Sequence, residues 1–238
     1  CYSRSESMRA STKRHPSDIR LTVGCDETGR ISGFVFDGIF NTGAYASWGP
    51  TVANRVPIHA SGPYATKDYR ANSIAVHTNA PPAGAFRGFG VPQSAVAQEC
   101  AFDLLAEKLG MDRLAFRRLN ALKNGVPTVT GQVFKSGVGI DDCFAALEDS
   151  WHAALESAAS FNQAAISDAS PWRNGVGIAS CWYGCGNTSL PNPSTMRMGI
   201  TADGRIVLHQ GAMDIGQGAN TVITQIAADA LGVPVHDV

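Results

Sequence analysis

The sequence predicts an α+β fold in which mixed sheets are flanked by helices. Hydrophobic residues make up 44% of the 238 residues and charged residues 16%, so the chain has ample material for a core. Segments with strand-type alternation lie towards both ends of the chain, and segments with helical periodicity lie between and after them. Strands and helices grouped in this way are typical of the α+β class.

The first predicted element is a β-hairpin over residues 18–40. Apolar and polar residues alternate up to Cys25, the turn Asp26-Glu27-Thr28-Gly29 follows, and residues 30–40 are again strand-type. The next segment, 41–84, is rich in Gly, Pro, Ser, Thr and Asn, and it predicts a long ordered loop with one short strand at 74–78. Loops of this length are usually functional.

Three helices are predicted in the middle of the chain. The first, 93–109, places Val96, Cys100, Leu104 and Leu105 on one apolar stripe and ends at Gly110. The second, 113–123, is capped by Asp112, with its leucines and Phe116 facing a core and Arg117, Arg118 and Lys123 in solvent. The third runs from 141 or 142 to about 160, and residues 161–174 have the composition of a linker.

The last part of the chain predicts strands at 175–182, 195–201 and 205–210, followed by a helix at 219–231. Ala202-Asp203-Gly204 is expected to be a hairpin turn. We place a division of the chain into a first domain, 1–150, and a second, 151–238.

Charge and hydropathy exclude several classes of protein. The net charge of −1 shows no footprint for nucleic acid or an anionic membrane. No run of about 18 apolar residues predicts a membrane span, and the N-terminus lacks the layout of a signal peptide, so we expect a cytoplasmic protein. Six cysteines in so long a chain argue against a disulfide framework.

Two glycine loops that open helices are the strongest functional signals. The first is Gly84-Ala85-Phe86-Arg87-Gly88-Phe89-Gly90-Val91-Pro92-Gln93, and the second is Gly211-Ala212-Met213-Asp214-Ile215-Gly216-Gln217-Gly218. Unpaired amides at helix N-termini suit oxyanions and cofactors rich in acceptors. Neither loop has the spacing of a nucleotide-binding fingerprint. A plain strand-to-helix corner is the competing interpretation of the first loop.

These residues resemble a known family. The run 85–93 with Asp214-Ile215-Gly216-Gln217-Gly218 downstream is similar to the paired motifs of the molybdenum-binding subunit in the xanthine dehydrogenase and aldehyde oxidase family. Arg4-Ser5-Glu6-Ser7-Met8, Lys13-Arg14-His15-Pro16 and Leu114-Ala115-Phe116-Arg117-Arg118-Leu119-Asn120 are similar to further family segments in the same order. The resemblance implies that the two domains are partial molybdopterin-binding domains.

The resemblance implies a molybdenum–molybdopterin cofactor and assigns residues to it. Ala85, Phe86 and Arg87 would approach the cofactor from one side, and Ile215, Gly216 and Gln217 from the other. A cofactor of many acceptors needs preorganised donors more than charge. No metal ligand is assigned within the chain.

The same resemblance assigns the substrate site. Arg55 would stabilise negative charge that develops on a heterocyclic substrate, and Phe89 would pack against its ring. Asn187 would bond a polar edge of the substrate. The competing interpretations are an ion pair for Arg55 and a core position for Phe89. A second stacking phenylalanine is missing near Gly186, and Trp182 or Tyr183 is a candidate to fill its place.

We therefore expect a piece of a molybdenum hydroxylase that oxidises an electron-poor carbon of a purine-like or nicotinate-like N-heterocycle, or an aldehyde, with oxygen derived from water. Its partners would be the remaining part of the molybdenum subunit and subunits or domains that carry 2Fe–2S clusters and FAD, and the isolated piece would be inactive. The alternatives are a scaffold or assembly segment of the same fold that binds no molybdenum, and a Ser or Cys hydrolase, for which no nucleophile motif is present.

Overall fold

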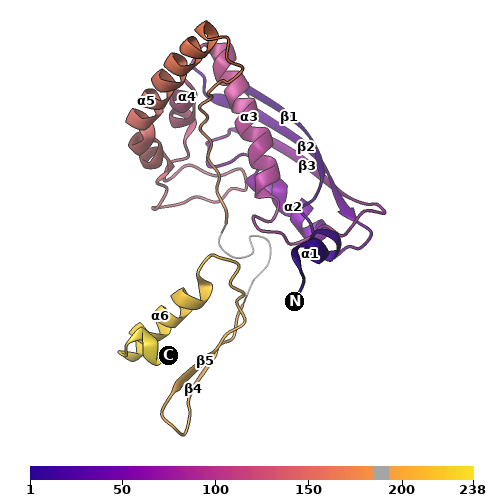
Figure 1. Ribbon diagram of the computed structural model, residues 1–238, viewed down its shortest axis with the longest axis vertical. Coiled ribbons are helices and arrows are strands. Elements are labelled where there is room, and N and C mark those ends of the chain that lie inside the picture. Colours follow the sequence, from indigo (N-terminus) through magenta and orange to yellow (C-terminus); the bar gives the residue numbers. More distant parts are fainter. Residues whose placement is uncertain (185–192) are drawn as a thin grey trace. The chain divides into compact units, whose positions relative to one another are not determined.

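The computed structural model describes residues 1–184 and 193–238, which divide into two compact units, Cys1–Tyr183 and Gly184–Val238 (Figure 1). Both units combine helices and strands, as predicted for the α+β class. The predicted domain boundary after residue 150 falls within a helix, α5 (Ile140–Ser167).

The first unit is built on a three-stranded sheet in the order β1 (Ser17–Cys25), β2 (Ile31–Gly43), β3 (Asp68–His77). β1 and β2 pair antiparallel, which confirms the predicted hairpin. β3 pairs parallel to β2 and is longer than the strand predicted at 74–78. Side chains alternate between the two faces of β2, and one face carries the buried rings of Phe34, Phe36 and Phe40.

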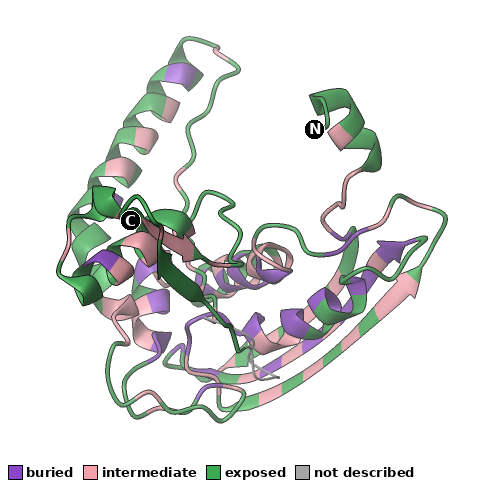
Figure 2. Ribbon diagram, turned by 90° about the horizontal axis from the view of Figure 1, so that it is seen from below, coloured by how far each residue is buried: buried purple, intermediate pink, exposed green. Residues whose placement is uncertain are grey.

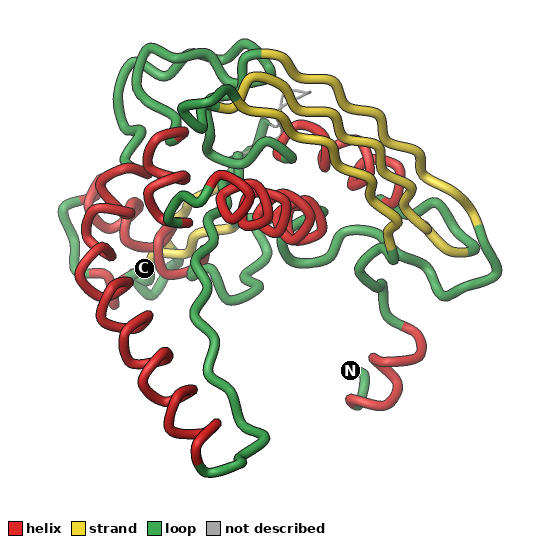
Figure 3. Tube along the Cα trace, turned by 90° about the horizontal axis from the view of Figure 1, so that it is seen from above, coloured by secondary structure: helices red, strands yellow, loops and turns green. Residues whose placement is uncertain are grey.

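A helix, α2 (Gly49–His59), connects β2 to β3, so the prediction of a loop over 41–84 was wrong at this point. Parallel strands need a crossover of roughly a dozen residues, and that crossover is usually helical. Pro50 lies in the first turn of α2 and Pro57 lies inside it, and proline in a sequence ordinarily argues against a helix. α2 and α3 (Val91–Leu109) lie on the same face of the sheet and enclose its phenylalanines (Figure 3).

α3 buries a different stripe from the predicted one. Val96 is 67% exposed and Leu104 is 68% exposed, whereas Gln98 and Phe102 are buried. Periodicity alone is compatible with either stripe. The stripe that carries the large ring of Phe102 packs against the sheet and against Phe34, with the two rings edge to face.

α4 (Arg113–Asn120) begins where it was predicted to begin, with the Asp112 carboxylate accepting the amide hydrogen of Ala115 at 2.9 Å. Arg117, which we expected in solvent, is fully buried because carboxylates on α3 receive its guanidinium. Arg117 and these carboxylates form the buried polar network described below.

α5 continues to Ser167, so part of the predicted linker 161–174 is helical. Most of α5 is exposed (Figure 2), and only Phe144, Trp151 and Ala165 are buried along it. Residues 175–182 form no strand, contrary to prediction, although they pack on the core through Val176 and Ile178. A short helix that was not predicted, α1 (Arg4–Ala10), precedes the sheet and has a capping box between Ser3 and Glu6.

The second unit consists of the hairpin β4 (Arg197–Ile200) and β5 (Ile206–His209), helix α6 (Ala219–Leu231) and a 3-10 turn, Val235–Asp237. The hairpin and α6 confirm the predicted elements. Ala228 is the one buried residue among the described residues of this unit. In the described parts of the two units, no helix is long and apolar enough to cross a membrane.

Candidate functional site

The first glycine loop joins β3 to α3, and its central residues are exposed. Ala85, Phe86 and Arg87 all lie on the surface. The loop ends at Gly90, which has φ of 95°, and a Cβ atom there would lie 2.5 Å from Cγ2 of Val56 on α2. The loop therefore lies directly against α2, in a conformation and at a spacing that only glycine fits.

The loop leaves several backbone donors open. The amide of Phe89 donates to the carbonyl of Phe86 at 2.7 Å, and the amide of Val91 donates to the carbonyl of Gly88 at 2.9 Å. The amides from Ala85 to Gly88 donate to no acceptor among the described residues. Four successive free donors at the entry to a helix fit a group that is rich in acceptor atoms.

Arg55 on α2 lies against two aromatic rings. Its side chain is buried, and its guanidinium carbon is 6.0 Å from the ring centre of Phe89 and 4.7 Å from that of Tyr183. Phe89 has φ of 45°, a left-handed conformation that is uncommon for a bulky residue. Residues kept in such conformations cluster at functional sites. The structure thus brings together the predicted pair Arg55 and Phe89 and adds Tyr183 to it.

His59, one turn further along α2, extends this aromatic cluster. Its ring stacks on Tyr183 with centres 5.6 Å apart and 19° between planes, and it meets Trp182 edge to face. Burial lowers the pKa of His59, and the charge of Arg55 has a smaller effect in the same direction. We define the aromatic cluster as Arg55, His59, Phe89, Trp182 and Tyr183.

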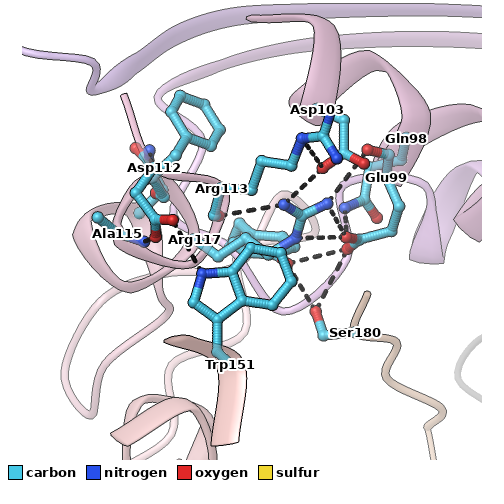
Figure 4. Close-up of polar contacts among 12 residues, drawn as sticks. Gln98, Glu99, Asp103, Asp112, Arg113, Ala115, Arg117, Trp151 and Ser180 are labelled. Atoms are coloured by element: carbon cyan, nitrogen blue, oxygen red, sulfur yellow. Dashed lines mark hydrogen bonds and ion pairs between the residues drawn. The ribbon is translucent and has the colours of Figure 1, made fainter. Parts of the chain in front are cut away.

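A buried polar network around Glu99 includes Ser180 (Figure 4), which lies in the segment that carries Trp182 and Tyr183. Ser180 donates to the hydroxyl of Tyr64 at 2.7 Å, and that hydroxyl donates to Glu99 at 2.9 Å. Further along the segment, Trp182 Nε1 donates to the carbonyl of His59 at 3.3 Å. The segment is therefore tied to α3 at one point and to α2 at another.

The centre of the network is an ion pair between α3 and α4. Arg117 donates through Nε to Glu99 Oε2 at 2.7 Å and lies 2.8 Å from Asp103 through Nη1. Gln98 also donates to Glu99, at 2.8 Å. Nothing in the spacing of these residues identified the network from the sequence. Removing one partner of a buried pair of this kind costs about 3–5 kcal/mol, because the other charge is left buried without compensation.

The second glycine loop, in the second unit, is exposed and bonded within itself. The Asp214 carboxylate accepts from the amide of Gly216 at 2.8 Å, and backbone hydrogen bonds lower the pKa of Asp214. Gln217 folds back on the loop, accepting from the amide of Ile215 at 2.6 Å and donating to the carbonyl of Met213 at 2.8 Å. Asp214 and Gln217 therefore hold the turn through bonds within the loop itself.

The predicted site residues fall into three groups. Arg55 and Phe89 lie together, and Ala85, Phe86 and Arg87 lie in the same loop as Phe89. Ile215, Gly216 and Gln217 belong to the second unit, which is described by itself. Asn187 lies outside the described residues. Among the described residues, no three His, Cys, Asp or Glu side chains are grouped so that they could hold a metal ion.

Comparison with known proteins gives a family match over both parts of the chain. Residues 1–121 match one model of a molybdopterin cofactor-binding domain, and residues 145–238 match a second. The nicotinate dehydrogenase large molybdopterin subunit of Eubacterium barkeri is 44% identical over 138 residues, which are 58% of this chain and 32% of that protein. A putative xanthine dehydrogenase molybdenum-binding subunit of Escherichia coli is 34% identical over 99% of this chain and 31% of that protein.

A solved structure is similar to this chain over nearly its whole length. The aldehyde oxidoreductase from Desulfovibrio gigas superposes with a TM-score of 0.78 and 25% identity, over 99% of this chain and 26% of that one. The chain spans about a third of the length of the curated relatives named above.

Proposed function

The chain belongs to the molybdopterin cofactor-binding family of xanthine dehydrogenase and aldehyde oxidoreductase molybdenum subunits, and from this premise we propose that it forms part of a molybdenum hydroxylase. The enzyme would oxidise an electron-poor carbon of an N-heterocycle, purine-like or nicotinate-like, or of an aldehyde. This chain would supply loops that face the cofactor and the substrate.

The first glycine loop fits a molybdenum–molybdopterin cofactor by the chemistry of its donors. The open amides from Ala85 to Gly88 would bond its acceptor atoms, and the exposed ring of Phe86 offers an apolar edge. When bound, the cofactor supplies the oxidation of the carbon and the transfer of oxygen derived from water. The chain's own contribution is to position the reacting groups.

Ile215, Gly216 and Gln217 would contact the cofactor from the second unit. The side-chain amide of Gln217 now bonds Ile215 and Met213, and it could exchange these bonds for bonds to the cofactor without unfolding the loop. Asp214 holds the turn in either arrangement through its bond from Gly216. The assignment of these three residues to the cofactor follows from the family motif.

The observation that carries the proposed substrate class is the buried guanidinium of Arg55 beside Phe89 and Tyr183. Aromatic faces next to a fixed cation suit a flat ring that gains negative charge as it is attacked. Arg55 would stabilise that charge, Phe89 would pack on the ring, and Asn187 would bond a polar edge. An aliphatic aldehyde would use the aromatic cluster less.

We further propose that the chain works with the remaining part of a molybdenum subunit and with partners that carry 2Fe–2S clusters and FAD. Two observations support this. The relatives are named as subunits, and the chain spans about a third of their length. The isolated chain would not turn over, because electrons leaving the substrate need a route to an acceptor.

The test uses the assembled enzyme that contains this chain. Molybdenum and pterin should be present at one each per chain, and nicotinate or hypoxanthine should be hydroxylated with oxygen-18 from labelled water. An enzyme that assembles fully with its partners but contains neither molybdenum nor pterin would instead establish the scaffold role. Hydroxylation of aldehydes alone would restrict the substrate class and exclude the heterocycles.

A further inference from the structure

Arg14, in the segment that leads into β1, contacts the first glycine loop at two residues and the first turn of α3 at a third. Its Nη2 donates to the carbonyl of Arg87 at 2.6 Å, its Nη1 donates to Oε1 of Gln93 at 3.3 Å, and its guanidinium carbon lies 4.8 Å from the ring centre of Phe86. One side chain, distant in sequence, thus joins the exposed part of the loop to the helix that follows it.

The segment that carries Arg14 is itself fixed. The amide of Lys13 donates to the carbonyl of Pro82 at 2.9 Å, and the amide of Gly84 donates to the carbonyl of Lys13 at 3.1 Å. His15 is buried and packs edge to face on Phe40 of the sheet core. Arg14 therefore contacts the exposed loop from a backbone segment that hydrogen bonds and core packing hold in place.

The bond to the carbonyl of Arg87 has a direct geometric consequence. In a trans peptide unit the carbonyl and the following amide point in opposite directions, and the described chain contains no cis bond. The carbonyl of Arg87 points at Arg14, so the amide of Gly88 points away from it. That amide is one of the four open donors of the loop.

We propose that Arg14 is a positioning residue that orients the Arg87–Gly88 peptide so that the Gly88 amide faces the cofactor. This role rests on the proposed function, since it assigns the open amides to the molybdopterin cofactor. Without Arg14, the peptide is free to rotate, because the carbonyl of Arg87 loses its charged hydrogen-bond donor.

The test compares Arg14→Ala, Arg14→Lys and the control Arg20→Ala in the assembled enzyme. Arg20 is an exposed arginine on the outward face of β1 and has no part in the site. We expect Arg14→Ala to lose pterin and molybdenum during dialysis at least about tenfold faster, since a hydrogen bond from a charged donor is lost. Arg14→Lys should recover part of the retention, and Arg20→Ala should match the native enzyme.

A second readout requires no bound cofactor. The peptide bond after Arg87 is a trypsin site, and its carbonyl is the one held by Arg14. In cofactor-free enzyme, Arg14→Ala should speed cleavage after Arg87 about tenfold, by the same energetic argument, with no change in cleavage after the exposed Arg173. Equal acceleration at both sites would indicate general unfolding and would overturn the positioning role.

The outcomes separate this proposal from the proposed function. Native enzyme without molybdenum or pterin refutes the function, whatever happens to the loop. Native enzyme with both, combined with unchanged retention and cleavage in Arg14→Ala, refutes the role of Arg14 alone. If Arg14→Ala fails to assemble, Arg14→Lys and Gln93→Ala decide, because each weakens the grip partly and both should speed cleavage after Arg87.

Discussion

The guanidinium carbon of Arg55 lies 4.7 Å from the ring centre of Tyr183, although 128 positions separate the two residues in the chain. Cation–π contacts of this kind hold a buried arginine in a fixed direction. The relationship links α2 to the segment that the Ser180 network fixes on α3. A substitution at Arg55 or at Ser180 should therefore also disturb the packing of the aromatic cluster.

Arg55→Ala should lower kcat/KM for a heterocyclic substrate by about 10²–10³-fold, because a preorganised donor that stabilises developing charge is removed. An aliphatic aldehyde develops no charge on a ring, so its kcat/KM should fall much less. Steady-state kinetics with both substrates checks this. Equal losses for both would assign Arg55 to the structure of the site and not to charge stabilisation.

Tyr183→Ala should raise KM for aromatic substrates about 3- to 10-fold, since an aromatic contact is worth about 0.5–1.5 kcal/mol. Tyr183→Phe keeps the ring over Arg55 and His59 and serves as the matched control. KM measured for the three proteins checks this. If Tyr183→Phe weakens substrate binding as much as Tyr183→Ala, the hydroxyl and not the ring is responsible.

Glu99→Ala should lower the free energy of unfolding by about 3–5 kcal/mol, because Arg117 is left as a buried charge without its main partner. Arg118→Ala removes an ion pair with Asp141 and Glu148 that is largely in water, and it should change little. Urea denaturation of the two variants checks the contrast. Similar losses in both would mean that the network is not the stabilising element.

Gly90→Ala should destabilise the first unit more than Gly110→Ala. Both glycines have positive φ, but a Cβ at Gly90 meets Val56 at 2.5 Å, whereas no atom lies within 4 Å of a Cβ at Gly110. Backbone strain alone costs about 1–3 kcal/mol and applies to both. Thermal melting separates the two, and equal shifts would show that α2 moves to accommodate the added methyl group.

Acidification should destabilise the chain through its buried histidines. Burial lowers the pKa of His15, so above about pH 6.5 the folded and unfolded forms are both neutral there. As the pH falls below that value, the unfolded chain takes up a proton that the folded chain does not, and stability decreases.

His15→Phe keeps a ring beside Phe40 and should reduce the drop in melting temperature between about pH 7.5 and about pH 5.5. It should not abolish the drop, since His59 contributes in the same direction. An unchanged drop would exclude His15 as a source.

Local signals in the sequence were sufficient for several elements. The hairpin of β1 and β2, the cap of α4 at Asp112 and the whole of α6 follow from alternation, capping and glycine stops. α2 was missed because Gly49, Pro50 and Pro57 mask its helical pattern. What reveals the need for a helix there is the parallel pairing of β2 with β3, which no local pattern encodes.

Local sequence patterns also predicted only part of the candidate site. The family motif pointed to Arg55 and Phe89, and the structure brings them together. Arg117 was expected in solvent because a charged residue is rarely buried without a partner. Its partners Glu99 and Asp103 lie on another helix, so the pairing depends on how α3 and α4 pack. Arg14 belongs to a segment that resembles the family, but its contact with the loop depends on the fold.

The carboxylate of Glu99 serves α3, α4 and the segment of Ser180 at once, and this shapes how the sequence can diverge. If Glu99 is substituted first, the guanidinium of Arg117 is left buried without its carboxylate partner. If Arg117 is substituted first, the carboxylate of Glu99 is left buried without its cation. Either intermediate would be selected against. Substitutions at these two positions should therefore occur as pairs among descendants, whereas Val96 and Leu104 on the open side of α3 can drift independently.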